Sequence, residues 1–178
     1  MNRRLQSAAL FASLILMSGL AGAQTTSSGT LAVSAELASS INLTFVTDGS
    51  GVTLGGSGTN AASLDFGTVS QYGTPPTNVT RSIGASTFTV STPFDISVTK
   101  SNITSANYTL GAVLENVDAV NSYTIDTLAL PTSPTAPVSL TVVGAYASNA
   151  SHTLALIIPF SENAVSISNT IDFLATAN

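Results

Sequence analysis

The sequence is poor in the side chains that carry out most protein chemistry. It contains no cysteine, no tryptophan and a single histidine, His152. Without cysteine the chain can form neither a disulfide framework nor a thiolate metal site. A single imidazole group also leaves few ways to build a transition-metal site or an acid–base centre. We therefore expect no catalytic residue, no bound metal and no cofactor, and we do not expect an enzyme.

Basic residues are equally scarce. The 178 residues contain four Lys and Arg against nine Asp and Glu. Beyond residue 23 the only cations are Arg81 and Lys100, so that part of the chain has a net charge of 2 − 9 = −7. Binding to nucleic acid or to an anionic lipid surface requires clustered Lys and Arg side chains. The charge pattern therefore excludes nucleic acid as a partner.

The N-terminus has the organisation of an export signal. The basic pair Arg3-Arg4 precedes an apolar stretch over residues 8–20, and residues 21–23 are the small residues that signal peptidase recognises. This stretch is shorter than the ~20 apolar residues that a membrane-spanning helix needs. We therefore expect residues 1–23 to be a cleaved signal peptide. The mature chain would have no membrane span and would be exported to the periplasm, the cell surface or the extracellular space.

What the chain has in abundance is alternation of apolar residues with small or polar ones, which is typical of strands that bury one face. The alternating runs are 31–37, 41–45, 64–69, 88–98, 108–114, 123–125, 138–142, 154–160 and 165–173. Turn-forming residues cluster at 48–51, 71–76, 131–137 and 148–152. No segment combines a helical period with a cap and a stop. The pattern predicts an all-β fold, a β-sandwich of about nine or ten strands.

We expect one domain over residues 30–178, preceded by a flexible tail at residues 24–29. A chain of this length can bury nearly 70% of its unfolded surface, so it can fold on its apolar core alone. The residues expected inside lie on the apolar sides of the runs: Phe45, Phe66, Phe88, Phe94, Ile96, Leu110, Leu140, Leu156, Ile158 and Phe173.

Several short motifs resemble functional sites but have simpler explanations. Residues 56–61 match a dinucleotide-binding string, yet no helix follows them. Ser97 and Lys100 match the S-x-x-K string of serine acyl-enzymes, but in a strand they lie on opposite faces. His152 is the one candidate general base, and we expect it to be a solvated turn residue. Strings of the N-x-S/T type, which arise by chance in a Ser- and Thr-rich chain, occur at Asn42, Asn78, Asn102, Asn107 and Asn149.

The long Gly-rich connection over residues 48–62 supports one alternative function. Its GGSGTN string at residues 55–60 resembles a single copy of a calcium-binding repeat, which binds metal only in tandem arrays. Asp48 could join loop carbonyls around a calcium ion. Loops of this length are usually functional or mobile. The alternative is thus a surface or periplasmic binding module with a ligand or calcium site in this loop.

The signal, the low-charge body rich in Ser and Thr, and two short motifs together resemble the secreted bacterial β-sandwich proteins around spore coat protein U and the major fimbrial subunits. The motifs are LDFGTV at residues 64–69, expected on an early strand, and IDFLATA at residues 171–177, expected as the final strand. The resemblance implies an immunoglobulin-like sandwich that assembles into a surface fibre or coat by strand exchange. The implied partners are copies of itself or related subunits, and a periplasmic chaperone.

The resemblance also suggests a role for residues 31–37. Leu31, Val33, Ala35 and Leu37 alternate directly behind the polar tail, where fimbrial subunits carry their donor strand. This segment either fills the groove of a neighbouring copy or pairs within its own sheet, which would give a self-contained monomer. Strands that are low in charge and rich in Thr, Val and Ile are poorly protected against edge pairing, which favours assembly.

Overall fold

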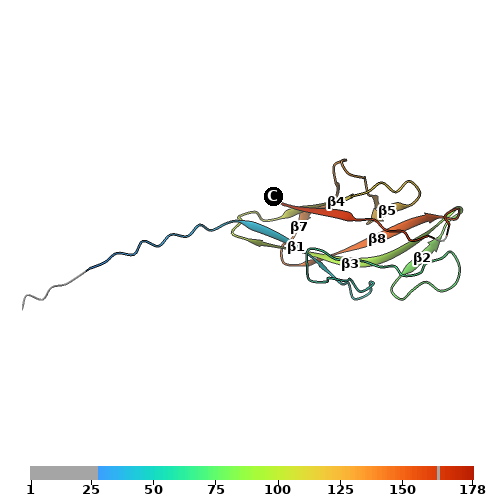
Figure 1. Cartoon of the computed structure of the whole chain (residues 1–178), viewed down its shortest axis with the longest axis horizontal. Helices are drawn as coiled ribbons and strands as arrows, with labels where there is room; N and C mark the ends of the chain where they lie inside the picture. The colour runs from blue at the N-terminus through green and yellow to red at the C-terminus, as the bar shows by residue number, and fades with distance from the viewer. Residues whose placement is uncertain (1–27, 164) are drawn as a thin grey trace, which may run out of the picture. The chain divides into compact units, whose positions relative to one another are not determined.

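A computed structural model describes residues 28–163 and 165–178 of the chain. The predicted signal peptide lies outside these residues. The chain divides into two units with a boundary between Glu36 and Leu37. The described part of the first unit, residues 28–36, contains no strand and is exposed. The second unit is all-β, and no helix in the described ranges has the length and hydropathy of a membrane span (Figure 1).

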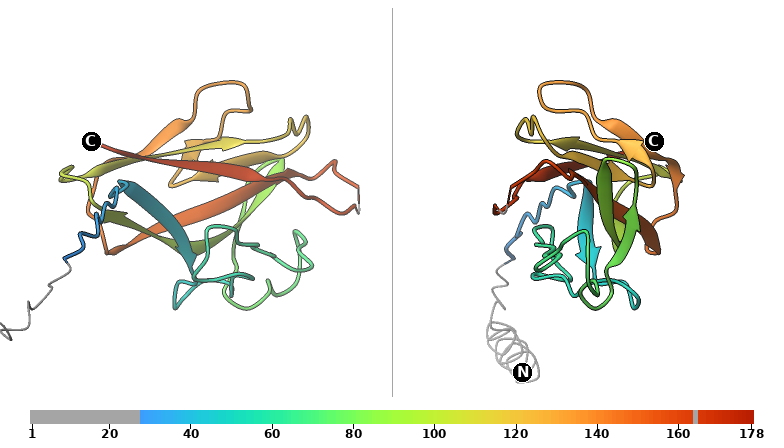
Figure 2. Two further views of the ribbon diagram at one scale, coloured as in Figure 1. Left: turned by 60° about the vertical axis from the view of Figure 1, so that its left-hand side comes forward. Right: turned by 90° about the vertical axis from the view of Figure 1, so that its right-hand side faces the viewer.

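Nine antiparallel strands form two sheets in the described part of the second unit, which confirms the predicted all-β class and strand number. The strands are β1 (Ser40–Val46), β2 (Thr80–Ile83), β3 (Thr87–Ser101), β4 (Tyr108–Leu114), β5 (Ser122–Ile125), β6 (Leu128–Ala129), β7 (Val138–Gly144), β8 (Asn149–Pro159) and β9 (Ile171–Ala177). One sheet has the order β1-β3-β8-β5-β6, with β2 also paired to β3, and the other has the order β7-β4-β9 (Figure 2). The two sheets pack in the manner of a β-sandwich.

The long strand β3 organises the larger sheet. Its even-numbered residues from Phe88 to Val98 are all buried, as the alternating run predicts. On one side β3 pairs with β8 from Thr87 to Ser97. On the other side its first half pairs with β2 and its second half with β1. The β1 and β2 strands therefore share one edge of the sheet.

Most of the predicted interior residues are buried, but not all. Those that are less than 9% exposed are Phe88, Phe94, Ile96, Leu110, Leu156 and Ile158. The remaining four, Phe45, Phe66, Leu140 and Phe173, pack against the core but are only half-buried. The three aromatic members of this second group lie on one side of the domain, which is described below as the candidate site.

The opposite side of the domain, which we name the closed side, is sealed by the chain itself. After β6 the chain crosses to the smaller sheet, where the Leu114 N–H donates to the Pro131 carbonyl and the Ser133 N–H donates to the Leu114 carbonyl, both at 2.8 Å. Ile125 and Leu130 are buried beneath this crossing, with exposed fractions of 0% and 8%. The crossing segment therefore covers this side of the core.

A carboxylate caps the turn that leads into the closed side. Asp118 accepts hydrogen bonds from the backbone N–H of Val120 (3.0 Å), the N–H of Asn121 (2.9 Å) and the Tyr123 hydroxyl (3.1 Å). Burial opposes the ionisation of Asp118, but the bonds from Asn121, Val120 and Tyr123 outweigh it and lower the pKa of the carboxyl. Burial, together with the bond to Asp118, raises the pKa of Tyr123 to about 12.

Three predictions about strands are wrong, and the last predicted run, residues 165–173, is a strand only from Ile171 onwards. Residues 31–37 form no strand, nor do residues 64–69, and the predicted turn at residues 148–152 belongs largely to β8. At residues 64–69 the Asp65 carboxylate accepts the Gly67 N–H at 2.7 Å, and Gly67 has a φ of 70°, so the chain bends locally. Alternation identifies which side chains would share a face, whereas a strand also requires a free edge to pair with.

Candidate functional site

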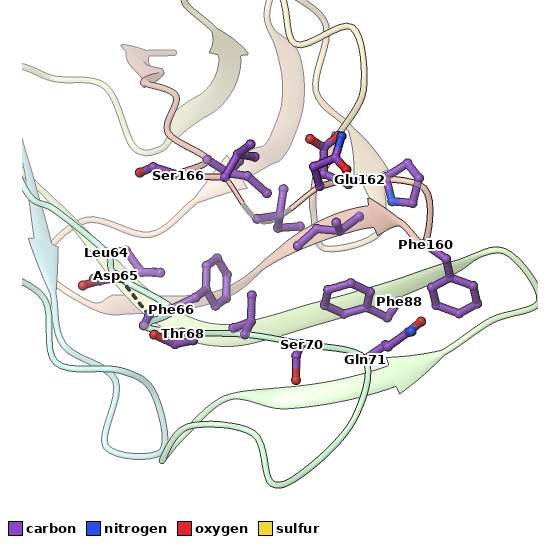
Figure 3. Close-up of a pocket in the computed structure, with 18 residues that line it drawn as sticks. Leu64, Asp65, Phe66, Thr68, Ser70, Gln71, Phe88, Phe160, Glu162 and Ser166 are labelled. Carbon is purple, nitrogen blue, oxygen red and sulfur yellow. Dashed lines mark hydrogen bonds between the residues drawn. The ribbon is translucent and has the colours of Figure 1, made fainter.

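An open groove runs along the side of the domain opposite the closed side. It consists of two neighbouring hollows of about 610 and 680 Å³ that share Leu64 in their linings. One wall of both hollows comes from residues 162–163 and 165–173, which precede and include the start of β9. Figure 3 shows the larger hollow, with Phe66 and Phe88 on one wall and Ser166 and Glu162 on the other.

The floor of the groove is an aromatic cluster. The ring of Phe173 lies 5.2 Å from the ring of Phe45 and 6.0 Å from the ring of Phe94, both in edge-on arrangements. Phe94 is buried, but Phe45 and Phe173 remain half-exposed to the groove. In the larger hollow Phe88 stacks on the exposed ring of Phe160 at 6.5 Å. Aromatic side chains left partly exposed together in a groove are consistent with a binding surface.

The strand β9 offers a free edge beside this apolar floor. β9 pairs with β4 from Ile171 to Ala177 and has no strand on its other side in the described chain. Backbone N–H and C=O groups along an unpaired edge can pair with another strand. Apolar side chains and free backbone groups together form a site that suits an extended peptide with alternating apolar residues.

The Gly-rich loop over residues 48–62 is ordered by its own hydrogen bonds. Asp48 accepts the backbone N–H and the hydroxyl of Ser50, both at 2.7 Å, and these bonds lower its pKa. No group of three His, Cys, Asp or Glu side chains is placed to hold a metal ion within residues 28–163 and 165–178. Asp48 is the loop's only carboxylate, and Asp95 of β3 is a second acidic side chain close to it. Two such groups fall short of the cluster of three that would favour the calcium alternative in the described residues.

The same loop covers the outer edge of β1 at Phe45. The Phe45 N–H donates to the Thr59 carbonyl at 2.8 Å, and the Gly58 N–H donates to the Phe45 carbonyl at 2.7 Å. Gly56 and Gly58 have φ values of 77° and 87°, which other residues adopt with difficulty. The string at residues 56–61 therefore serves a tight loop, and β1 is protected where β9 is not.

His152 is not the solvated turn residue that the sequence predicts. It lies within β8, is 4% exposed, and its Nδ1 is 2.5 Å from an Asp126 carboxylate oxygen. The turn before β8 is shorter than predicted, because residues 149–151 continue the pairing with β3. The Nε2 atom is buried without a hydrogen-bond partner, so no hydroxyl in the described residues completes a triad with this pair. The pair links the turn after β5 to β8.

Other candidate residues have structural roles. Lys100 lies on β3 and donates to the Ser105 carbonyl, and its Nζ is 4.8 Å from the centre of the Tyr146 ring, a cation–π contact. Ser97 is paired in the same strand. Two Asn residues of the N-x-S/T strings support the backbone: Asn78 donates to the Gly51 carbonyl at 2.8 Å, and Asn102 donates to that of Ala38 at 2.9 Å.

Residues 31–37, the segment that the sequence suggests as a donor strand and that we name the donor segment for that reason, carry exposed apolar side chains outside the nine strands. Leu31, Val33 and Leu37 are 88%, 84% and 80% exposed. The self-paired alternative, in which residues 30–37 belong to their own sheet, is therefore wrong for this structure. Sequence reasoning identified this segment but missed the groove and Asp126.

Comparison with known proteins gives no assignment. No protein-family model matches the chain, and no curated protein or solved structure matches it either.

Proposed function

We propose that this protein is an exported structural subunit of a bacterial cell-surface fibre or coat. In this proposal the domain is an immunoglobulin-like sandwich that lacks one strand, and a strand from another copy completes it. The observation that supports the proposal is that one chain contains both an open groove and an unpaired segment that could fill such a groove. One is the open groove with its half-exposed aromatic floor beside the free edge of β9. The other is the exposed donor segment.

The donor segment and the groove are complementary in length and in pattern. The segment has seven residues, as does β9. Its apolar residues at 31, 33, 35 and 37 would share one face, while Ala32, Ser34 and Glu36 would face solvent. Full burial of a Val or Leu side chain contributes about 1.5–3 kcal/mol. Three such side chains and a set of backbone hydrogen bonds would offset the entropy lost when the segment becomes ordered.

The proposed contact produces a fibre because the donor segment and the groove are different surfaces. Such a heterologous contact repeats without closing, so each added copy offers a new groove or a new donor segment. Before assembly the groove and the donor segment are both apolar and exposed, which makes the free subunit prone to aggregation. A periplasmic chaperone that covers the groove during export is therefore part of the proposal.

The test is deletion of residues 24–37 from the mature chain. We expect a folded domain that stays monomeric, whereas the mature protein forms oligomers in size-exclusion chromatography and fibres in electron microscopy. A synthetic peptide of residues 28–39 should bind the truncated domain and raise its melting temperature. The matched peptide controls are Val33→Asp, which places a charge on the apolar face, and Ser34→Asp, which places it on the polar face.

Only the Ser34→Asp peptide should retain binding. A mature protein that remains monomeric at millimolar concentration, or a truncated domain that does not bind the peptide, would contradict the proposal.

A further inference from the structure

The connection between the donor segment and β1 is unusually short. Only Ala38 and Ser39, which we name the spacer, separate Leu37 from the first residue of β1, Ser40. The inference that follows rests on the proposed function. We infer that the subunit cannot fill its own groove with its own donor segment, so that donation takes place only between copies.

Self-insertion through the shortest hairpin would put the wrong face of the donor segment inside. A two-residue turn at the spacer would pair Leu37 with Ser40 and bring Glu36 opposite Ile41, a β1 residue that packs against the core. Residues directly opposite each other in an antiparallel pair share a face, and a one-residue slip exchanges the faces. The Glu36 carboxylate would therefore enter the core, and the apolar residues of the donor segment would face outwards.

A three-residue turn would restore the register but has the wrong sequence. It would include Ser40 and would break the pairing of Ser40 with Ser101 at the end of β3. Hairpins of this length usually need Gly or Asn in the left-handed conformation. Residues 38–40 read Ala-Ser-Ser and offer neither.

A side chain also holds the spacer in line with β1. The Asn102 amide donates to the Ala38 carbonyl at 2.9 Å, just beyond the last residue pair of the β1–β3 ladder. This bond continues the ladder for one further step, and Asn102 itself has a φ of 58°. A turn at the spacer would break the bond. Asn102 is therefore a positioning residue that opposes self-insertion.

The direction of the chain is unfavourable as well. Ser40 lies at the same end of the domain as the C-terminus, because a short connection links Ser101 of β3 to Tyr108 of β4, which pairs with Ala177 (Figure 2). A donor segment that folded back along β1 would run parallel to β9. Since the loop at residues 58–59 already occupies the outer edge of β1 at Phe45, the inserted strand would find part of that edge taken and would rely more on this parallel ladder. Parallel pairing is slightly less stable than the antiparallel pairing open to another copy.

The experiment lengthens the spacer in the mature chain. A Gly/Ser linker of about six residues, inserted between Ala38 and Ser39, removes the constraints on turn length and register. The matched control carries the same linker between Gly29 and Thr30, upstream of the donor segment. Each protein is refolded at about 1 μM and separated by size, and protection of residues 31–37 is measured by hydrogen exchange.

We expect the control and the unmodified chain to assemble, and the lengthened-spacer variant to be a monomer with residues 31–37 protected. A flexible tether gives an effective concentration in the millimolar range, roughly 10³-fold above the subunit concentration. Asn102→Gly tolerates the positive φ but lacks the side-chain amide. This variant should also yield some monomer with residues 31–37 protected, but a smaller fraction of it than the lengthened-spacer variant. A lengthened-spacer variant that assembles as readily as the control would overturn the inference.

Protected residues 31–37 in an unmodified monomer would also overturn the inference, while leaving strand donation itself intact. Failure of the proposed function gives a different result, in which none of the proteins assembles and residues 31–37 exchange freely in all of them. That result overturns both the proposed function and the inference.

Discussion

The two long sides of this domain are built from similar residues, but one side is covered by the chain and the other is open. On the closed side the chain after β6 crosses between the sheets, and Ile125 and Leu130 are buried beneath it. On the open side no segment within residues 37–163 and 165–178 crosses over Phe45 and Phe173, which lie half-exposed in the lining of the groove. The difference indicates that the exposure of the groove follows from the absence of a crossing segment among the described residues and not from the polarity of the side chains there.

The largest effect is expected from substitution of Phe94, whose ring lies between the groove and the interior of the larger sheet. The Phe94 ring lies 6.0 Å from that of Phe173 in the groove and 6.0 Å from that of His152. It is 4% exposed, so Phe94→Ala should lower the free energy of unfolding by about 3–5 kcal/mol. Urea denaturation of the truncated domain measures this change. A loss below about 1 kcal/mol would mean that the core does not continue from one side to the other.

The next prediction concerns the link between β8 and the turn after β5. Asp126→Ala leaves the buried His152 Nδ1 without its partner, which should destabilise the domain by about 1–3 kcal/mol. The exposed Glu115 provides the control, and Glu115→Ala should change stability by no more than about 0.5 kcal/mol. Equal effects of the two substitutions in thermal denaturation would show that the link contributes nothing.

A smaller effect is expected at the groove, and it should depend on whether the groove is filled. Phe173→Ala should lower the stability of the empty domain by only about 1–2 kcal/mol, because water already reaches part of the ring. With the peptide of residues 28–39 bound, the loss should approach the 3–5 kcal/mol of a buried aromatic. Denaturation of both forms with and without peptide measures the two values. Equal losses would argue that the groove is already closed.

The smallest effect appears only at high pH and on the closed side. Because the pKa of Tyr123 is raised to about 12, the unfolded state loses this proton first, at pH near 10. The stabilisation is complete below pH 10 and is lost as the pH rises towards 12. Tyr123→Phe should make the alkaline loss of stability shallower, although burial also raises the pKa of Tyr108. Tyr72→Phe, at a residue that is 77% exposed, should leave the profile unchanged.

The sequence predicted the paired strands well because alternation and burial agree in them. The run from Phe88 to Val98 faces a core on one side and has neighbours at both edges, so its pattern and its structure coincide. The donor segment has the same alternation but no partner in its own domain. The alternation of residues shows which face of a strand would be buried. Whether the segment forms a strand depends on a neighbouring strand edge, which residues far along the chain supply.

The candidate site could be predicted only in part for the same reason. Phe45 and Phe173 were expected inside from their position on alternating runs, and their half-exposure is a property of the whole fold. His152 was misplaced because the small and polar residues 149–151 read as a turn, although their backbones continue the ladder to β3. Asp126 carries no local signal, since its partner His152 lies 26 residues away.

The short spacer has a mechanical consequence for any fibre formed by strand donation. Two extended residues span at most about 7 Å, so a domain and the neighbour that receives its donor segment could not move far apart. Successive domains would sit almost end to end, with little freedom to pivot at the joint. Such a filament would resemble a stiff rod with a regular axial repeat, unlike a string of domains on flexible linkers.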